Sequence, residues 1–118
     1  MSDAPFRFTE AERQAIQGIV ARYPERQAAL LPVLRMAQER AGWLSPDVME
    51  EVALVLALPP AHVAGVASFY TLFYKRPVGR HVVQICRNIS CALLGGLDLI
   101  EHAQKRLGVP PGGTTADR

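Results

Sequence analysis

Apolar residues recur at helical spacing through the first two thirds of the chain, and start and stop signals divide them into four segments. Thr9 and Glu12 have the spacing of a capping box, which predicts that the first helix begins at Thr9. Tyr23-Pro24 ends this helix, because proline pushes the preceding residue out of the α region. The apolar face of the helix consists of Ile16, Ile19 and Val20.

Three more helices follow at short intervals. The second ends at Gly42. Ser45-Pro46-Asp47 combines an N-cap residue, a proline at the first helical position and an acid at the positive helix end, which predicts a third helix running to about Ala57. Pro59-Pro60 begins a fourth, which we expect to end near Tyr74. The apolar stripes are Leu30, Leu31, Leu34 and Ala37 in the second helix and Val63, Val66, Ala67 and Tyr70 in the fourth.

Each of these stripes must be buried against its neighbours, so we expect a compact four-helix lobe over residues 9–76. Aromatic side chains at i and i+4 near its end could form a partner surface, but we expect them to belong to the core. They are Phe69, Tyr70, Phe73 and Tyr74.

The pattern changes after a turn signal at residues 77–79. His81–Ile85 is rich in β-branched residues and predicts a short strand, and an amphipathic helix ending at Gly108 follows the glycine pair Gly95-Gly96. We expect these glycines to allow tight packing beside the preceding cysteine loop. One strand and one helix cannot form an independent sheet domain, so residues 80–118 predict an incomplete α/β domain and the whole chain an α+β protein.

Composition excludes several function classes. Of the 118 residues, 49% are hydrophobic and 20% charged, as in globular proteins, and the net charge of +2 comes without a basic run that would bind nucleic acid. Pro59 and His62 interrupt the longest apolar stretch well below the roughly 20 residues of a membrane span. The N-terminus shows no secretory signal, so we expect a cytoplasmic location.

Cys86 and Cys91 are the only cysteines, separated by Arg-Asn-Ile-Ser at the end of the predicted strand. The spacing alone leaves three interpretations: half of an iron-sulfur site, two unreactive thiols, or a redox disulfide, which lacks the usual C-x-x-C spacing. A zinc site is a weaker fourth, because His81 lies roughly 16 Å from Cys86 in an extended strand. His102 is expected to face solvent, and His62 has no nucleophile near it to activate.

Several motifs together resemble the thioredoxin-like 2Fe-2S ferredoxin family, whose bacterial members include the E-type component of NADH-quinone oxidoreductase (complex I). They are Leu31-Pro32-Val33-Leu34, Gly42-Trp43-Leu44, Gly65-Val66-Ala67-Ser68-Phe69-Tyr70 and Cys86-Arg87-Asn88-Ile89-Ser90-Cys91. The resemblance implies a helical lobe followed by a thioredoxin-like domain with one 2Fe-2S cluster, and Cys86 and Cys91 match its first pair of ligands. The second pair, a C-x3-C loop, has no counterpart before Arg118.

The resemblance further implies electron transfer as the function, beside a flavin-bearing NADH-oxidising subunit and other complex I subunits. The protein would lie at the inner membrane only through that complex, without a membrane span of its own. This chain alone would not be expected to catalyse the reaction of the complex. The alternatives are a cluster-less binding or assembly module, and the equivalent subunit of an NAD-dependent formate dehydrogenase or hydrogenase.

Overall fold

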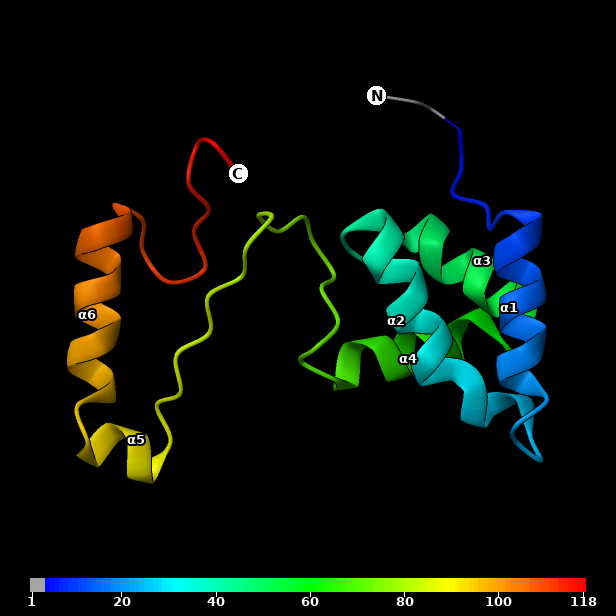
Figure 1. Cartoon of the computed structure of the whole chain (residues 1–118), viewed down its shortest axis with the longest axis horizontal. Helices are drawn as coiled ribbons and strands as arrows, with labels where there is room; N and C mark the ends of the chain where they lie inside the picture. The colour runs from blue at the N-terminus through cyan, green and yellow to red at the C-terminus, as the bar shows by residue number, and fades with distance from the viewer. Residues whose placement is uncertain (1–3) are drawn as a thin grey trace. The chain divides into compact units, whose positions relative to one another are not determined.

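The structure of this protein is a computed structural model that describes residues 4–118. The chain forms two compact units, a first that ends at Pro77 and a second over Val78–Arg118 (Figure 1). The helices of the first unit are α1 (Glu10–Val20), the short 3-10 helix η1 (Arg26–Ala29), α2 (Leu30–Ala41), α3 (Pro46–Leu56) and α4 (Pro60–Phe69).

Local signals fix most of the helix ends in the first unit. The Thr9 hydroxyl accepts a hydrogen bond from the Glu12 amide and the Glu12 carboxylate accepts one from the Thr9 amide, so the predicted capping box is present. Gly42 ends α2 with a φ of 84°, a left-handed conformation that glycine adopts without strain. Pro46 and Pro60 occupy the first positions of α3 and α4, where a missing amide proton costs nothing.

The core of the first unit lies between α2, α3 and α4, which pack against one another in sequence order, with α1 and η1 against α2. All fifteen buried hydrophobic residues of the described chain lie in this unit. The largest of them that are fully buried include Ile16 from α1, Leu30 and Leu34 from α2, and Leu56 from α3. Most residues of the stripes predicted for the first, second and fourth helices therefore meet in one core, whereas Leu31 and Tyr70 are 38% and 36% exposed.

The end of α4 differs from the prediction. The helix stops at Phe69 rather than near Tyr74, because Tyr70 has extended backbone angles. Gln38 holds the following segment: its side-chain amide donates to the Leu72 carbonyl at 3.0 Å and its oxygen accepts from the Tyr74 amide at 2.7 Å. The expectation that all four aromatics are core is wrong, since Phe73 is 2% exposed but Phe69 is 79% exposed.

The segment before α1 is held against the first unit by two acids of α3. The carboxylate of Glu51 is fully buried and pairs with Arg7 at 2.8 Å and with Arg13 at 2.5 Å. It also accepts a hydrogen bond from the Phe8 amide at 3.2 Å. Asp47 accepts from the Phe6 amide at 2.9 Å. A surface segment is thereby tied to a core helix by charged groups.

The second unit contains α5 (Ile89–Leu93) and α6 (Gly96–Leu107), which pack against each other. The predicted amphipathic helix is confirmed as α6, and Gly108 ends it with a φ of 68°. The predicted strand over His81–Ile85 does not form, and residues 4–118 contain no strand at all, because a strand needs a hydrogen-bonded neighbour. The helical part of the predicted fold class is confirmed, and its β part stays a prediction.

No single helix within residues 4–118 is long and apolar enough to cross a membrane. Only α3 and α4 taken together reach that length and composition, and their axes are bent by 119° at the break between them.

Candidate functional site

The two cysteines lie on either side of the start of α5. Cys86 lies in the irregular segment that leads into α5, and Cys91 lies within the helix. Asn88 is the N-cap of α5, and its side-chain oxygen accepts a hydrogen bond from the Ile89 amide at 2.8 Å. This cap explains a helix that hydrophobic spacing did not predict. It also turns the chain so that both thiols face one hollow.

Local hydrogen bonds make the two thiols unequal. The Asn88 backbone amide and the neighbouring Cys91 thiol both stabilise the Cys86 thiolate, so the pKa of Cys86 is below its usual value. The pKa of Cys91 is raised, first because its thiol is hydrogen-bonded to Cys86 and second because of the charge on Cys86. The pair therefore loses its first proton from Cys86, and the second proton is held more firmly.

Two glycines at the start of α6 allow this helix to pack closely against the cysteine loop. Gly95 adopts a φ of 94°, in the left-handed region that favours glycine. A Cβ on Gly96 would lie 2.8 Å from the Cys91 carbonyl oxygen and 2.9 Å from the Cys86 carbonyl oxygen. Any side chain at position 96 would clash with the backbone of the cysteine loop, so only glycine fits. The tight packing expected for this glycine pair is thus confirmed at Gly96.

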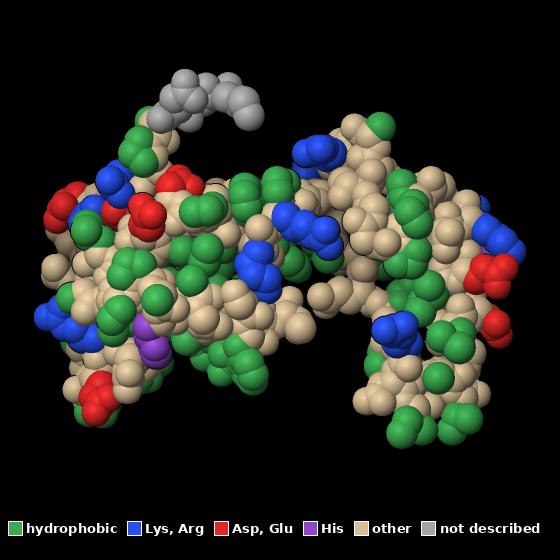
Figure 2. All heavy atoms as spheres, turned by 180° about the vertical axis from the view of Figure 1, so that it is seen from behind, with side chains coloured by type: hydrophobic (Ala, Val, Ile, Leu, Met, Phe, Trp, Pro, Cys, Tyr) green, Lys and Arg blue, Asp and Glu red, His purple; other side chains and the backbone are tan. Residues whose placement is uncertain are grey.

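An open hollow of about 680 Å³ leads to both thiols. The residues that line it include Cys86, Cys91, Leu94, Asp98 and His102. Cys86 is exposed and Cys91 is partly buried, so solvent reaches the pair from this side. Apolar side chains are common on the surface of the second unit, as the right-hand part of Figure 2 shows, and Leu94 is 89% exposed.

The other residues considered from sequence do not join the cysteines as a metal site. In the part of the chain that the structure covers, no group of three His, Cys, Asp or Glu side chains could hold a metal ion. His102 is exposed as expected, although it borders the same hollow. His81 and His62 are also exposed, and neither lines this hollow. The zinc interpretation therefore has no support among residues 4–118.

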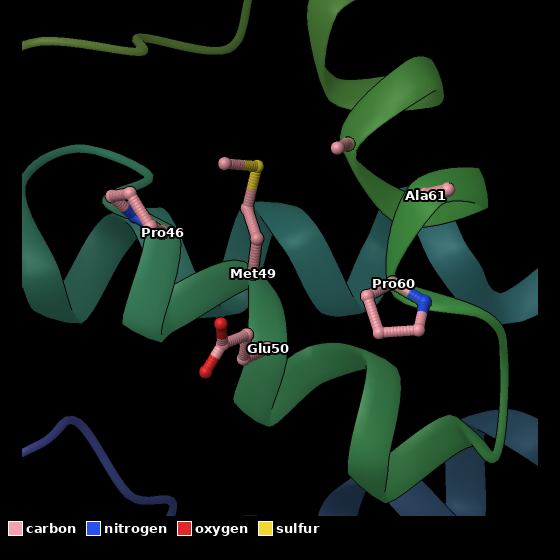
Figure 3. A pocket seen from close by; sticks show the side chains of 6 residues that line it. Pro46, Met49, Glu50, Pro60 and Ala61 are labelled. Carbon is pink, nitrogen blue, oxygen red and sulfur yellow. The ribbon is translucent and has the colours of Figure 1, made fainter.

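A second hollow, of about 270 Å³, lies between α3 and the start of α4 in the first unit (Figure 3). It is lined by Pro46, Met49, Glu50, Pro60, Ala61 and Ala64. A single carboxylate among apolar groups offers neither a nucleophile with its base nor a set of metal ligands. Of the two hollows, only the one beside Cys86 and Cys91 carries candidate metal-binding thiols.

Comparison with known proteins identifies the family of the chain. The model of the family described as thioredoxin-like [2Fe-2S] ferredoxin matches residues 16–118. The chain belongs to this family. The resemblance inferred from the sequence motifs is thereby confirmed, and the 2Fe-2S cluster expected from it is the cofactor after which this ferredoxin family is described.

Curated relatives of this ferredoxin include three bacterial proteins, each a subunit of an NADH-quinone oxidoreductase. The chain is 43% identical over 105 residues to the subunit designated E 2 of Rhizobium meliloti, covering 89% of the chain and 62% of the relative. It is 36% identical to subunit 2 of Thermus thermophilus, covering 93% and 62%, and 35% identical to the subunit designated E of Escherichia coli, covering 95% and 68%. The chain thus spans about two thirds of the length of these relatives.

The donor set agrees in part with the cluster of the family. Iron-sulfur clusters of the 2Fe-2S type are held by four ligands, usually thiolates. Cys86 and Cys91 supply two thiols in one hollow, and the described residues contribute no third ligand to it. The site fits one half of such a cluster.

Proposed function

We propose that this ferredoxin is an electron-transfer subunit of an NADH-quinone oxidoreductase, with Cys86 and Cys91 as two ligands of its 2Fe-2S cluster. The observation that carries the proposal is the pair of neighbouring thiols in one open hollow, in a chain whose family match runs through them. The names of the relatives support the choice of complex. The partners would be the flavin-bearing NADH-oxidising subunit and other subunits of that complex.

Under this proposal the two parts of the chain have different tasks. Residues 9–76 form a helical lobe that folds around its own core, and residues 80–118 begin a thioredoxin-like domain that carries the ligands. The second pair of ligands would come from the C-x3-C loop that the family resemblance implies. The protein would be peripheral to the membrane, on its cytoplasmic side, through its complex.

The cluster, when bound, accepts and passes on one electron at a time, and the residues of this chain set the conditions. Cys86 and Cys91 provide thiolate sulfur, and the lowered pKa of Cys86 favours the deprotonated form that binds metal. The Asn88 backbone amide stabilises the Cys86 thiolate, and amides that donate to cluster sulfur tune the potential of a cluster. Gly95 and Gly96 hold the loop in place. No side chain is required to act as an acid or a base.

The test is anaerobic reconstitution with iron and sulfide, followed by visible absorption and by EPR after reduction. It compares this chain with a version that continues past Arg118 with the sequence encoded downstream. We expect a 2Fe-2S spectrum from the extended version and little or none from residues 1–118, since two thiolates leave half of the iron coordination unfilled. An extended version that contains the C-x3-C loop and stays colourless would refute electron transfer and leave the binding-module interpretation.

A substitution at the site separates ligation from folding. Cys86→Ser in the extended version is expected to abolish cluster binding while the helical circular dichroism stays almost unchanged. Ile89→Ala is the matched control, because Ile89 lies in the same loop, is 76% exposed and has no ligating atom. Loss of the helical signal in Cys86→Ser would make Cys86 structural instead.

A further inference from the structure

A reaction that needs no metal is also open to Cys86 and Cys91. Both thiols are free, only four residues separate them, and both cysteines line the same hollow. Their backbones are held together by α6, since one point beside Gly96 lies within 3 Å of both cysteine carbonyl oxygens. A disulfide requires two cysteines whose backbones already lie close together, and this support provides that condition.

Access to the pair comes from one side. The hollow that both cysteines line is open to solvent, and Cys86 is the more exposed of the two. Cys91 is partly buried within the short helix α5. An external oxidant therefore meets Cys86 first, and Cys91 is placed to react second.

We propose that, when no cluster is bound, Cys86 and Cys91 close an intramolecular disulfide by exchange with a glutathione-type disulfide, and that this closed form takes up no iron until it is reduced. The first half of the inference depends only on the two thiols. The second half rests on the proposed function.

The exchange balances without further reactants. The Cys86 thiolate attacks one sulfur of the oxidant, whose S–S bond breaks and releases one small thiolate, leaving a mixed disulfide on Cys86. Cys91 then loses its proton to solvent and attacks the Cys86 sulfur, which releases the second small thiolate. Two protein thiols are oxidised and one external disulfide is reduced to two thiols. The disulfide between Cys86 and Cys91 is exposed, and exposed disulfides are readily reduced. The block of iron uptake is therefore reversible.

The first experiment uses the reduced chain of residues 1–118 in anaerobic mixtures of reduced and oxidised glutathione. Free thiols are then alkylated, and the intact mass is measured without reduction. We expect the number of alkylated thiols to fall from two to none as the mixture becomes oxidising, in a monomer that lacks two hydrogens and carries no glutathione. Two thiols that remain alkylated, linked dimers or a stable double adduct would each overturn the inference.

Single-cysteine variants test the order of attack. Cys91→Ser is expected to accumulate one glutathione on Cys86 in oxidising mixtures, since no second protein thiol is left to displace it. Cys86→Ser is expected to accumulate several-fold less under the same mixture, because Cys91 is partly buried. Equal labelling of the two variants would contradict the assigned entry through Cys86.

The second experiment uses the version extended past Arg118, oxidised in the same glutathione mixture. Mass spectrometry first verifies that Cys86 and Cys91 are joined by a disulfide. Iron and sulfide without a dithiol reductant are expected to give no cluster spectrum, and addition of the reductant restores it. Cluster formation while the 86–91 disulfide persists would overturn the block. If the reduced extended version also fails to bind a cluster, the proposed function fails, whereas the disulfide is still decided by mass alone.

Discussion

Glu51 provides the sharpest test of how the first unit is held together. Its carboxylate is fully buried in α3, where it accepts a hydrogen bond from the Phe8 amide and pairs with Arg7 and Arg13. Removal of this side chain by Glu51→Ala leaves the buried Phe8 amide without a partner and detaches the segment before α1. We expect a clear loss in the free energy of unfolding.

The magnitude follows from how exposed each partner is. A buried amide left without an acceptor costs about 1–3 kcal/mol, and the lost methylene adds about 1 kcal/mol. The Arg7 and Arg13 side chains are 59% and 34% exposed, so they return to water and their pairs contribute only about 0–1 kcal/mol each after solvent screening. Glu51→Ala is therefore expected to cost about 2–6 kcal/mol, most of it from the Phe8 amide and the cavity.

Two matched variants make the argument refutable. Glu51→Gln keeps the shape and the acceptor for Phe8 and is expected to cost about 1–2 kcal/mol, whereas Glu50→Ala, at an exposed neighbour, should stay within about 0.5 kcal/mol. The free energy of unfolding of each variant is measured by urea titration followed by Trp43 fluorescence. Trp43 is the only tryptophan and lies in the first unit, so its fluorescence reports on that unit. A loss below about 1 kcal/mol for Glu51→Ala, or equal losses for Ala and Gln, would show that the buried acceptor for Phe8 does not carry this stability.

The remaining predictions concern backbone, pH and dynamics. Gly42→Ala, at a φ of 84° with open space around it, should cost about 1 kcal/mol through strain alone, by urea titration. Ala57→Gly, at a φ of 53°, should change stability in the opposite direction by up to about 1 kcal/mol in the same assay. The Ser45 hydroxyl and then the Phe6 amide lower the pKa of Asp47 in the folded protein. The stabilisation from Asp47 is therefore present above its pKa in the unfolded chain and is lost as the pH falls through its pKa in the folded protein. Asp47→Asn should accordingly reduce the dependence of the free energy of unfolding on pH below about pH 4. Hydrogen exchange should be slow in α2 and α3 and fast throughout Val78–Arg118, and equal protection in the two units would contradict this.

The parts of the fold that sequence predicted are those with local causes. A capping box at Thr9, a proline at position 46 and glycines at 42 and 108 act within a few residues, and each helix end that they predict is observed. The end of α4 has a distant cause instead. Gln38 binds the backbone of residues 72 and 74 from more than thirty residues away, so the aromatic spacing after Phe69 gave no sign of the turn.

Glu51 was missed although a signal was present. It stands three residues after Val48 and one before Val52, on the stripe of α3 that faces the core. A charged residue at such a position is rarely buried without a partner, so it indicates an ion pair. The partners themselves, Arg7 and Arg13, lie about forty residues earlier, and spacing alone does not connect them.

Spacing and motifs led to Cys86 and Cys91 as candidate ligands, which the structure places in one hollow, and their role as ligands stays a prediction. The glycine pair correctly predicted close packing beside them. The short helix α5 depends on one Asn88 cap and was expected to be a loop. The strand over 81–85 was predicted from residue type, but its formation depends on a neighbouring strand that residues 4–118 do not provide.

The two units differ in how much apolar surface they bury, and the proposed ligands lie in the unit that buries less. The first unit holds all fifteen buried hydrophobic residues, whereas in Val78–Arg118 only Gly96 is buried. A segment of this size that buries almost no apolar surface gains little free energy of its own to offset its chain entropy. Binding of a group at Cys86 and Cys91 is therefore expected to add to the ordering of α5 and α6, as metal binding does in other small domains. On this argument a bound group adds to the local support that Asn88 and Gly96 already give the cysteine loop.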